Sequence, residues 1–277
     1  GESGPSELAS RPTVPVKLFT EGVEPADPDA PIWRFMNLWK AKDLFATSEL
    51  FFNRADRFPQ DEQEGIPPEE YIIRVRGLNP LDLKDRLELN NDLATLAQFR
   101  ESMYVNCWYL FDEERTHTWK TYGDDGVAVV STYAKLKAAL DALPADDDAH
   151  LGLVRYGTRH LTRYSTIMVI TTKREEFAHD RHVRALLWIR DKYAGINRRY
   201  DINIFPHPRP LTAPDPVRVN DFHRRKVDIS ALITEVVVNP KATPPLLDEV
   251  AQVVRNAGHA IPVNESVLAR YSRFLPF

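Results

Sequence analysis

Short apolar runs alternate with amphipathic segments along this chain, and their spacing predicts strands and helices in mixed order. β-Branched and aromatic residues fill the short runs, and such side chains pack well on a pleated sheet. In the run at 183–189, Ala185 and Leu186 leave a helix as the alternative. The expected strands are 50–52, 105–109, 127–130, 151–156, 167–171, 183–189 and 236–238.

Apolar residues at helical spacing, together with capping residues, predict the helices. The clearest helix begins after Thr243, because Pro244 and Pro245 suit a first turn, and it ends before Gly258. The other helices are expected over 37–47, from Asn90 or Asn91 to about 104, over 113–122, and from Ser131 or Thr132 to about 143.

This order of elements predicts an α/β or α+β fold, in which helices flank a mixed central β-sheet. We expect one main globular domain over 31–277. Prolines interleaved with acidic residues indicate a flexible N-terminal arm over 1–30. Further prolines predict a surface insertion around 206–216, as a loop or in polyproline conformation.

The composition narrows the class of protein. The chain has 277 residues, of which 43% are hydrophobic, so it can bury a sizeable core. Its net charge of -4 is unlike that of a basic duplex-DNA-binding domain, although a local basic patch is still allowed. The single cysteine, Cys107, excludes an intramolecular disulfide and is expected to be a buried apolar side chain. Without a membrane-length apolar stretch or a signal-peptide core, we expect a cytoplasmic protein with no membrane partner.

Sequence motifs of several common activities are missing from the chain. GxGxxG after a strand and GxxxxGK[ST] are both absent, which argues against a dinucleotide-binding Rossmann unit and a P-loop. HExxH and GxSxG are absent too. Three weaker clusters of polar and aromatic residues therefore carry the candidate chemistry.

The first cluster follows the strand expected at 50–52. Arg54 could grip a phosphate there, while Asp56 and the acidic residues Asp61, Glu62 and Glu64 could hold a divalent ion. The alternative is a solvated acidic loop.

The second cluster is aromatic. Trp108, Trp119 and Tyr122 lie near His117 and Lys120, and their rings could stack on a base or a nicotinamide. Trp119 and Tyr122 are three residues apart and share a helical face, a spacing that is also typical of core residues.

The third cluster packs histidines, cations and acids into residues 173–184. His179 and Asp180 suit general acid–base catalysis, and Lys173, Arg174 and Arg184 suit phosphate binding. The alternative is a charged surface turn between two strands. No metal-ligand set is assigned here.

Taken together, these segments resemble a bacterial family known as domain of unknown function 2971. The resemblance spans residues 32 to 268 and rests on short motifs in a fixed order. The motifs are Ile32–Phe35, Leu50–Asp56, Val105–Trp108 with Thr118–Gly123, Gly126–Thr132 with Lys173–Arg184, and Glu235–Pro240 with Pro262–Ser266.

The chain departs from that family pattern at two places. The acidic loop at 58–65 has its order scrambled, and His182 stands where the pattern has a second acid after Asp180. If that second acid were catalytic in relatives, this chain would be altered or inactive. The resemblance implies no particular activity.

Three functions compete at this point. The first is a nucleotide- or nucleic-acid-directed transferase that uses NAD, since Arg34 on an early strand, stacking aromatics and a late polar cluster loosely match ADP-ribosyltransferase-like folds. The second is a binding or effector module without chemistry, in a phage-defence or toxin setting. The third is a metal-dependent nuclease or phosphohydrolase, with Lys173 near the phosphate. It would use Asp56, Asp61, Glu64, His179 and Asp180.

Overall fold

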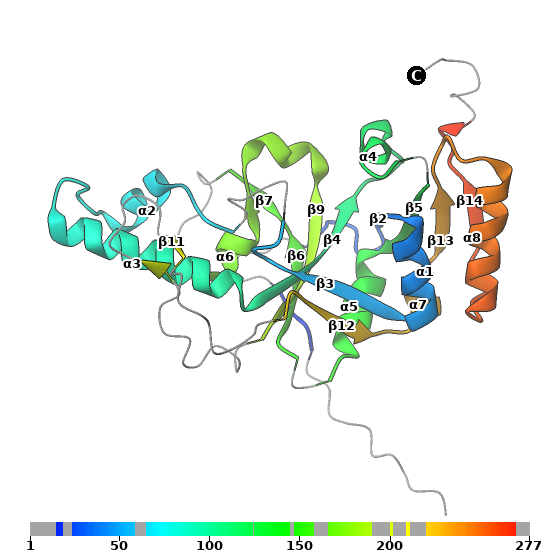
Figure 1. The fold of residues 1–277 in the computed structure, drawn as a ribbon, viewed down its shortest axis with the longest axis horizontal. Coiled ribbons are helices and arrows are strands. Elements are labelled where there is room, and N and C mark those ends of the chain that lie inside the picture. The colour runs from blue at the N-terminus through cyan, green and yellow to red at the C-terminus, as the bar shows by residue number, and fades with distance from the viewer. Residues whose placement is uncertain are drawn as a thin grey trace, which may run out of the picture.

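The computed structural model of this chain is built around one large mixed β-sheet with helices on both faces (Figure 1). It describes residues 15–18, 24–58, 65–123, 125–144, 147–157, 166–189, 200–201, 209–210 and 220–269. The prediction of a mixed central sheet with flanking helices is confirmed. Within the described residues, no helix is both long enough and apolar enough to span a bilayer.

The sheet has a continuous path in the order β1-β6-β9-β4-β2-β5-β13-β14, and β3 joins it by pairing with both β4 and β12. Most pairs are antiparallel, whereas β1–β6 and β13–β14 are parallel. The strands are β1 (Lys17–Leu18), β2 (Pro31–Asn37), β3 (Glu49–Arg54), β4 (Met103–Leu110), β5 (Gly126–Thr132), β6 (Ala149–Leu153), β9 (His182–Trp188), β12 (Phe222–Lys226), β13 (Glu235–Val238) and β14 (Val263–Glu265). Separate two-stranded pairs are formed by β7 (Arg155–Tyr156) with β8 (Thr172–Lys173) and by β10 (Tyr200–Asp201) with β11 (Arg209–Pro210).

One face of the sheet carries the main core. Side chains alternate between the faces of a strand, so Tyr104 and Trp108 of β4 both point into this core. Helix α1 adds Ala41, Leu44 and Phe45, whose spacing forms one helical stripe. The helices on this face are α1 (Leu38–Thr47), α5 (Tyr133–Asp141), α7 (Ile229–Leu232) and α8 (Pro244–Asn256).

The opposite face carries smaller clusters under short helices. Trp33, Phe35 and Phe111 pack here with Trp119, and the Phe35 and Trp119 rings meet edge to face at 4.8 Å. The short helices are α4 (Thr116–Lys120), α6 (Thr166–Ile170) and the 3₁₀ helix η1 (Glu175–Asp180).

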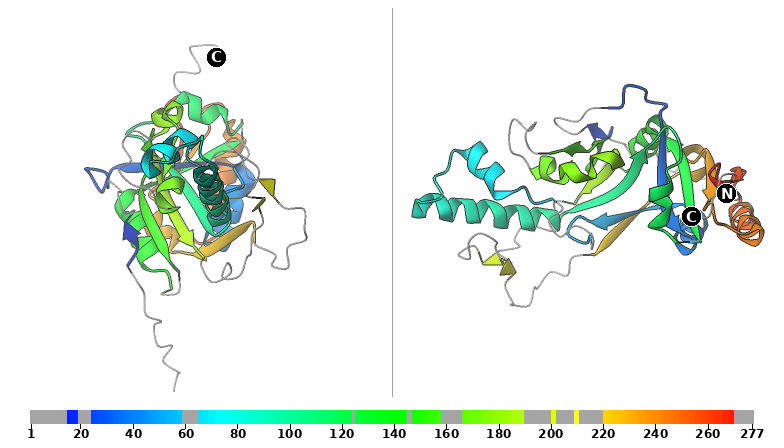
Figure 2. Two further views of the ribbon diagram at one scale, coloured as in Figure 1. Left: turned by 90° about the vertical axis from the view of Figure 1, so that its left-hand side faces the viewer. Right: turned by 90° about the horizontal axis from the view of Figure 1, so that it is seen from above.

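A helical extension projects beyond one end of the sheet. It consists of α2 (Glu69–Arg76) and α3 (Leu83–Arg100), and Figure 2 shows α3 reaching away from the strands. Tyr71, Leu89 and Leu93 form a small core there with Met168 of α6. This extension therefore has packing of its own, separate from the main core.

Strand β4 divides the sheet into a fork. Its start pairs with β3 at Tyr104 and Val105, and its end pairs with β2 at Tyr109 and Leu110. Residues 106–108 pair with β9 on one side but with neither β2 nor β3 on the other. Strands β2 and β3 run in the same direction and are joined by α1, the crossover that two such strands require. The fork between β2 and β3 therefore lies at the middle of β4.

Three local predictions are corrected by the structure. The apolar run at 167–171 is helix α6, because Met168 and Val169 fit the small core with α3, and short apolar runs do not separate helix from strand. Helix α3 begins at Leu83 instead of Asn90 or Asn91, since Asp82 accepts hydrogen bonds from the amides of Lys84 and Asp85.

The N-terminal prediction is corrected only in part. Lys17 and Leu18 pair with β6, so the chain is not a loose arm there. Residues 1–14 and 19–23 lie outside the described residues, as does most of the proline-rich segment at 206–216.

Two leucines on helices test where the core lies. Leu136 on α5 is fully buried in the main core, whereas Leu87 on α3 is 46% exposed. We expect Leu136→Ala to lower the free energy of unfolding by about 2–5 kcal/mol, and Leu87→Ala by less than about 1 kcal/mol. Urea unfolding measures both, and equal losses would contradict this assignment of the core.

Candidate functional site at the sheet fork

Arg34 occupies the fork between β2 and β3. Its backbone pairs with Val129 of β5, and its guanidinium donates a hydrogen bond to the Phe51 carbonyl of β3 at 3.3 Å. The Asn106 side-chain amide of β4 donates to the same carbonyl at 2.9 Å. Two side chains thus bridge the place where the backbone ladder is interrupted.

Among the described residues, no carboxylate forms an ion pair with Arg34. Burial lowers the pKa of Arg34, and electrostatic interactions with Cys107 and Tyr122 raise it. The nearby Lys40 of α1 is a second cation, whose pKa is lowered by burial and then by the Arg34 charge. The fork is therefore a region of positive charge suited to an anion.

Two tyrosines line the opposite side of this region. Tyr109 of β4 donates a side-chain hydrogen bond to Tyr122, and both side chains are half-buried. Burial raises the pKa of both hydroxyls, and at Tyr122 the hydrogen bond from Tyr109 and the charge of Arg34 work against that rise. The Tyr122 ring stacks on Phe35 at 6.0 Å, which fixes its orientation.

Asp180 stands at the end of η1 with three histidines around it. Its Oδ1 atom lies 3.4 Å from His179 Nε2 and 3.9 Å from His117 Nε2, and its Oδ2 atom lies 3.8 Å from His182 Nε2. The next residue, Arg181, has φ 44° and turns the chain from η1 into β9. Its carbonyl accepts from Leu110 N–H, so Asp180 is held at the end of β4.

His182 is a buried neutral histidine behind Asp180. The Tyr156 hydroxyl accepts from the His182 backbone N–H at 2.7 Å and lies 3.0 Å from Nδ1. The same hydroxyl can donate to Nδ1 or accept from it, depending on the tautomer, and the other ring nitrogen, Nε2, faces Asp180 at 3.8 Å. Burial, together with the charges of Lys173 and Arg184, holds the pKa of His182 well below its usual range.

Tyr122 connects the two halves of the site. Both Arg34 and Asp180 influence the pKa of its hydroxyl, so a cation from β2 and a carboxylate from η1 lie within electrostatic range of one aromatic side chain. The transferase hypothesis had grouped Arg34, the stacking aromatics and the late polar cluster, and in the structure Arg34 and Asp180 both lie within electrostatic range of Tyr122. A cation suited to an anionic ligand and a carboxylate therefore both act on one aromatic side chain.

The first predicted cluster lies elsewhere. Arg54 pairs across to Tyr104, five residues from Tyr109 along β4, which is about 17 Å. Its guanidinium forms ion pairs with Asp56 at 2.6 Å and with Asp221 at 3.4 Å. Asp56 and Asp180, both used in the nuclease hypothesis, therefore lie apart, and Asp61, Glu62 and Glu64 lie outside the described residues.

Two of the predicted stacking rings are core residues. Trp108 has no exposed surface and donates its indole N–H to Asn106. Trp119 is 3% exposed and donates to Glu114. Neither ring can stack on a ligand from these positions, because the sheet and α4 cover them.

The cations of the third cluster differ in how deeply their side chains are buried. Arg184 is 1% exposed and donates to the Ile170 carbonyl, so it anchors the end of α6 and does not face a ligand. Arg174 is half-exposed and forms an ion pair with Glu176 at 3.1 Å. Lys173 lies over the Phe177 ring and within electrostatic range of His182, at the edge of the site.

Some residues of the site were missed or misjudged from the sequence. Tyr109 and Tyr156 carry no motif, and only the pairing of β4 with β9 and of β7 with β8 places them beside Asp180. Cys107 is partly buried instead of fully buried. His117 was noticed only as a neighbour of Trp119, yet its Nε2 joins His179 and Asp180 in a set whose ligand atoms lie within 4.8 Å of one another.

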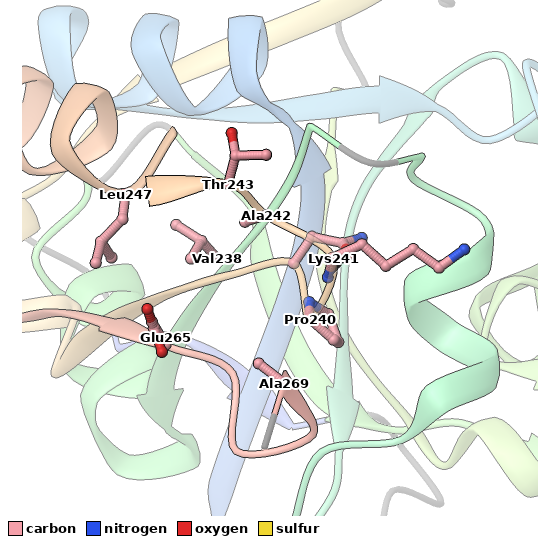
Figure 3. A pocket seen from close by; sticks show the side chains of 9 residues that line it. Val238, Pro240, Lys241, Ala242, Thr243, Leu247, Glu265 and Ala269 are labelled. Atoms are coloured by element: carbon pink, nitrogen blue, oxygen red, sulfur yellow. Dashed lines mark hydrogen bonds between the residues drawn. The ribbon is translucent and has the colours of Figure 1, made fainter. Parts of the chain in front are cut away.

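Two cavities lie away from the fork. One of about 220 Å³ separates the end of β13 from α8, and Figure 3 shows Val238 and Leu247 at its wall, with Lys241 extending away from Glu265. A second, of about 530 Å³, is lined by Asp112, Glu113, Glu114, Glu235 and Glu265 among others. The carboxylates of this second cavity would repel a phosphate, and Arg34 lines neither cavity.

The buried neutral state of His182 predicts a pH dependence of stability. The unfolded chain takes up a proton here near pH 6.5, whereas native His182 stays neutral, so stability falls as the pH drops below about 6.5. The loss is up to about 1.4 kcal/mol per pH unit. Urea unfolding at several pH values should show a shallower fall for His182→Gln, and an unchanged slope would contradict the burial argument.

Comparison with known proteins finds only distant likeness. No protein-family model matches the chain, and no curated protein matches it. Two solved structures of Thermus sp. 2.9 DarT are similar, one in complex with NAD+ at 12% identity and one with ADP-ribosylated ssDNA at 11%. In each the TM-score is 0.37, over 88% of this chain and 97% of the other. At that TM-score the likeness carries no argument about this chain.

Proposed function

We propose that this protein is a nucleotide-directed transferase that uses NAD as its donor, with the fork as its active site. The observation that supports this most directly is that Arg34 and Asp180, from distant segments, both lie within electrostatic range of Tyr122. An anion site, an aromatic surface and a carboxylate are the parts that binding and cleaving a dinucleotide require.

Arg34 and Lys40 would bind the pyrophosphate. Arginine offers planar paired donors that match phosphate oxygens, and Lys40 adds a second charge. The Phe51 carbonyl holds the Arg34 guanidinium in place, so little side-chain freedom is lost when the phosphate binds. No carboxylate ion pair among the described residues competes for that charge.

Tyr122 and Tyr109 would hold the nicotinamide ribose. Their rings are half-buried, and their hydroxyls already share a hydrogen bond, so they present a fixed polar and aromatic edge. Stacking of a base on such a ring contributes roughly 1–3 kcal/mol.

Asp180 would act on the reacting atoms. The bond between ribose C1′ and the nicotinamide nitrogen breaks, and nicotinamide leaves with that electron pair. The acceptor oxygen or nitrogen forms the new bond to C1′, and its proton passes to Asp180. The carboxylate also faces the positive charge that develops on the ribose. His182 is a positioning residue, since its Nε2 faces the second carboxylate oxygen.

A binding module without chemistry is the alternative that the test must separate. Such a module would hold the nucleotide through Arg34 and would not need Asp180. Variants of Arg34 therefore report on nucleotide binding, and variants of Asp180 report on the transfer reaction. Together they distinguish a transferase from a binding module.

We predict that Arg34→Ala weakens NAD binding by about 10- to 100-fold, the amount expected for a hydrogen-bonded charge contact. Asp180→Asn should keep binding but slow nicotinamide release about 100- to 10,000-fold. Calorimetry measures binding, and release is followed by chromatography with nucleotide and single-stranded nucleic acid acceptors.

Arg57→Ala is the matched control, because Arg57 is an exposed arginine that is paired with Asp221 at the other end of β4. It should behave as wild type, and far-ultraviolet circular dichroism checks that every variant is folded. NAD binding without nicotinamide release would favour the binding module, and wild type that does not bind NAD would refute the proposal.

A further inference from the structure

Three side chains at the rim of the site have the geometry of a metal-ligand set. Around a tetrahedral zinc ion with bonds of about 2.0–2.1 Å, neighbouring ligand atoms lie about 3.3 Å apart. His179 Nε2 and Asp180 Oδ1 are 3.4 Å apart, and His117 Nε2 is 3.9 Å from the same oxygen. The ligand atoms of all three residues lie within 4.8 Å of one another, so side-chain rotation would have to draw them closer around an ion.

His179 is already in the tautomer that a metal requires. Its Nδ1 lies 3.0 Å from the Glu176 carbonyl, which can only accept, so the ring proton is on Nδ1. This leaves the lone pair on Nε2, the atom that faces Asp180. Metal-bound histidines almost always donate their other N–H to such an acceptor. In addition, Arg115 donates to the His179 carbonyl at 2.9 Å and holds its backbone.

Asp180 has the outer support expected of a metal-bound carboxylate. Its Oδ1 faces the two ligand histidines, while its Oδ2 faces His182 Nε2 at 3.8 Å. His182 is in turn fixed by Tyr156. The ligand atoms are thus oriented by a second layer of hydrogen bonds and electrostatic contacts.

We propose that His117, His179 and Asp180 bind one zinc ion. Two imidazoles and one carboxylate favour a transition metal over Mg²⁺ or Ca²⁺, which prefer oxygen ligands. Three protein ligands leave a fourth position for water or an incoming ligand. The side chains of His117 and His179 are 50% and 56% exposed, so an ion can enter from solvent.

A consequence for regulation follows, and it rests on the proposed function. Asp180 cannot accept the acceptor's proton through an oxygen that is bound to zinc. Zinc would therefore inhibit NAD-dependent transfer, with a midpoint at its own dissociation constant. Transfer that continues at saturating zinc would refute this regulation, although the metal site itself is tested separately.

The metal site is tested without NAD on the full chain, after removal of any affinity tag and treatment with a chelator. Calorimetric titration with zinc chloride should show one site in wild type, and Co²⁺ should give the visible absorption of a four-coordinate ion. His179→Ala and Asp180→Asn should each weaken zinc binding at least 100-fold. His182→Gln should weaken it about 10- to 100-fold, as outer-layer changes do.

Glu176→Gln is the matched control, because this exposed side chain is adjacent to the site and only its backbone carbonyl serves the metal set. It should bind zinc as wild type does. Absence of binding in wild type, or equal binding in His179→Ala and Asp180→Asn, would overturn the proposal. Zinc binding in a chain that lacks transferase activity would leave the metal site standing and refute the proposed function alone.

Discussion

The division of β4 between two partners is the constraint on which the rest of the structure depends. Strands β2 and β3 both run antiparallel to β4 and take different halves of it, so residues 106–108 lack a ladder partner on that side. A buried backbone carbonyl without a partner is costly, and the Phe51 carbonyl gains its partners from Arg34 and Asn106. A buried guanidinium is costly as well unless it is paired. The fork therefore places a cation where an anionic ligand would supply the missing counter-charge.

Two structural units contribute the candidate residues. Strand β2 and helix α1 bring Arg34 and Lys40, while η1 and β9 bring Asp180 and His182. Tyr122, after α4, feels the charges of both Arg34 and Asp180, whereas Tyr109 of β4 feels that of Asp180. Because Tyr156 and the Arg181 carbonyl fix the second unit to the sheet, the carboxylate is held by the fold and does not depend on a surface loop. This arrangement suits chemistry that requires a fixed distance between a phosphate and a reacting carbon.

The sequence predicted most strands because β-branched runs such as 127–130 and 236–238 are buried from both sides. It failed at 167–171, where packing against α3 decided between helix and strand. The candidate residues Arg34, Tyr122 and Asp180 could be proposed from residue type. Their meeting could not, because it depends on the register of β4 with β2 and β9. The sequence also could not show which candidate side chains are buried. Trp108 and Arg184 have the chemistry to bind a ligand, yet neither side chain reaches solvent.

A crystal structure with a non-hydrolysable NAD analogue tests the central claim most directly. The account predicts the pyrophosphate on the Arg34 guanidinium, the nicotinamide ribose beside Tyr122, and C1′ facing the Asp180 carboxylate. An analogue bound in the cavity between β13 and α8, or one whose phosphates lie away from Arg34, would contradict it.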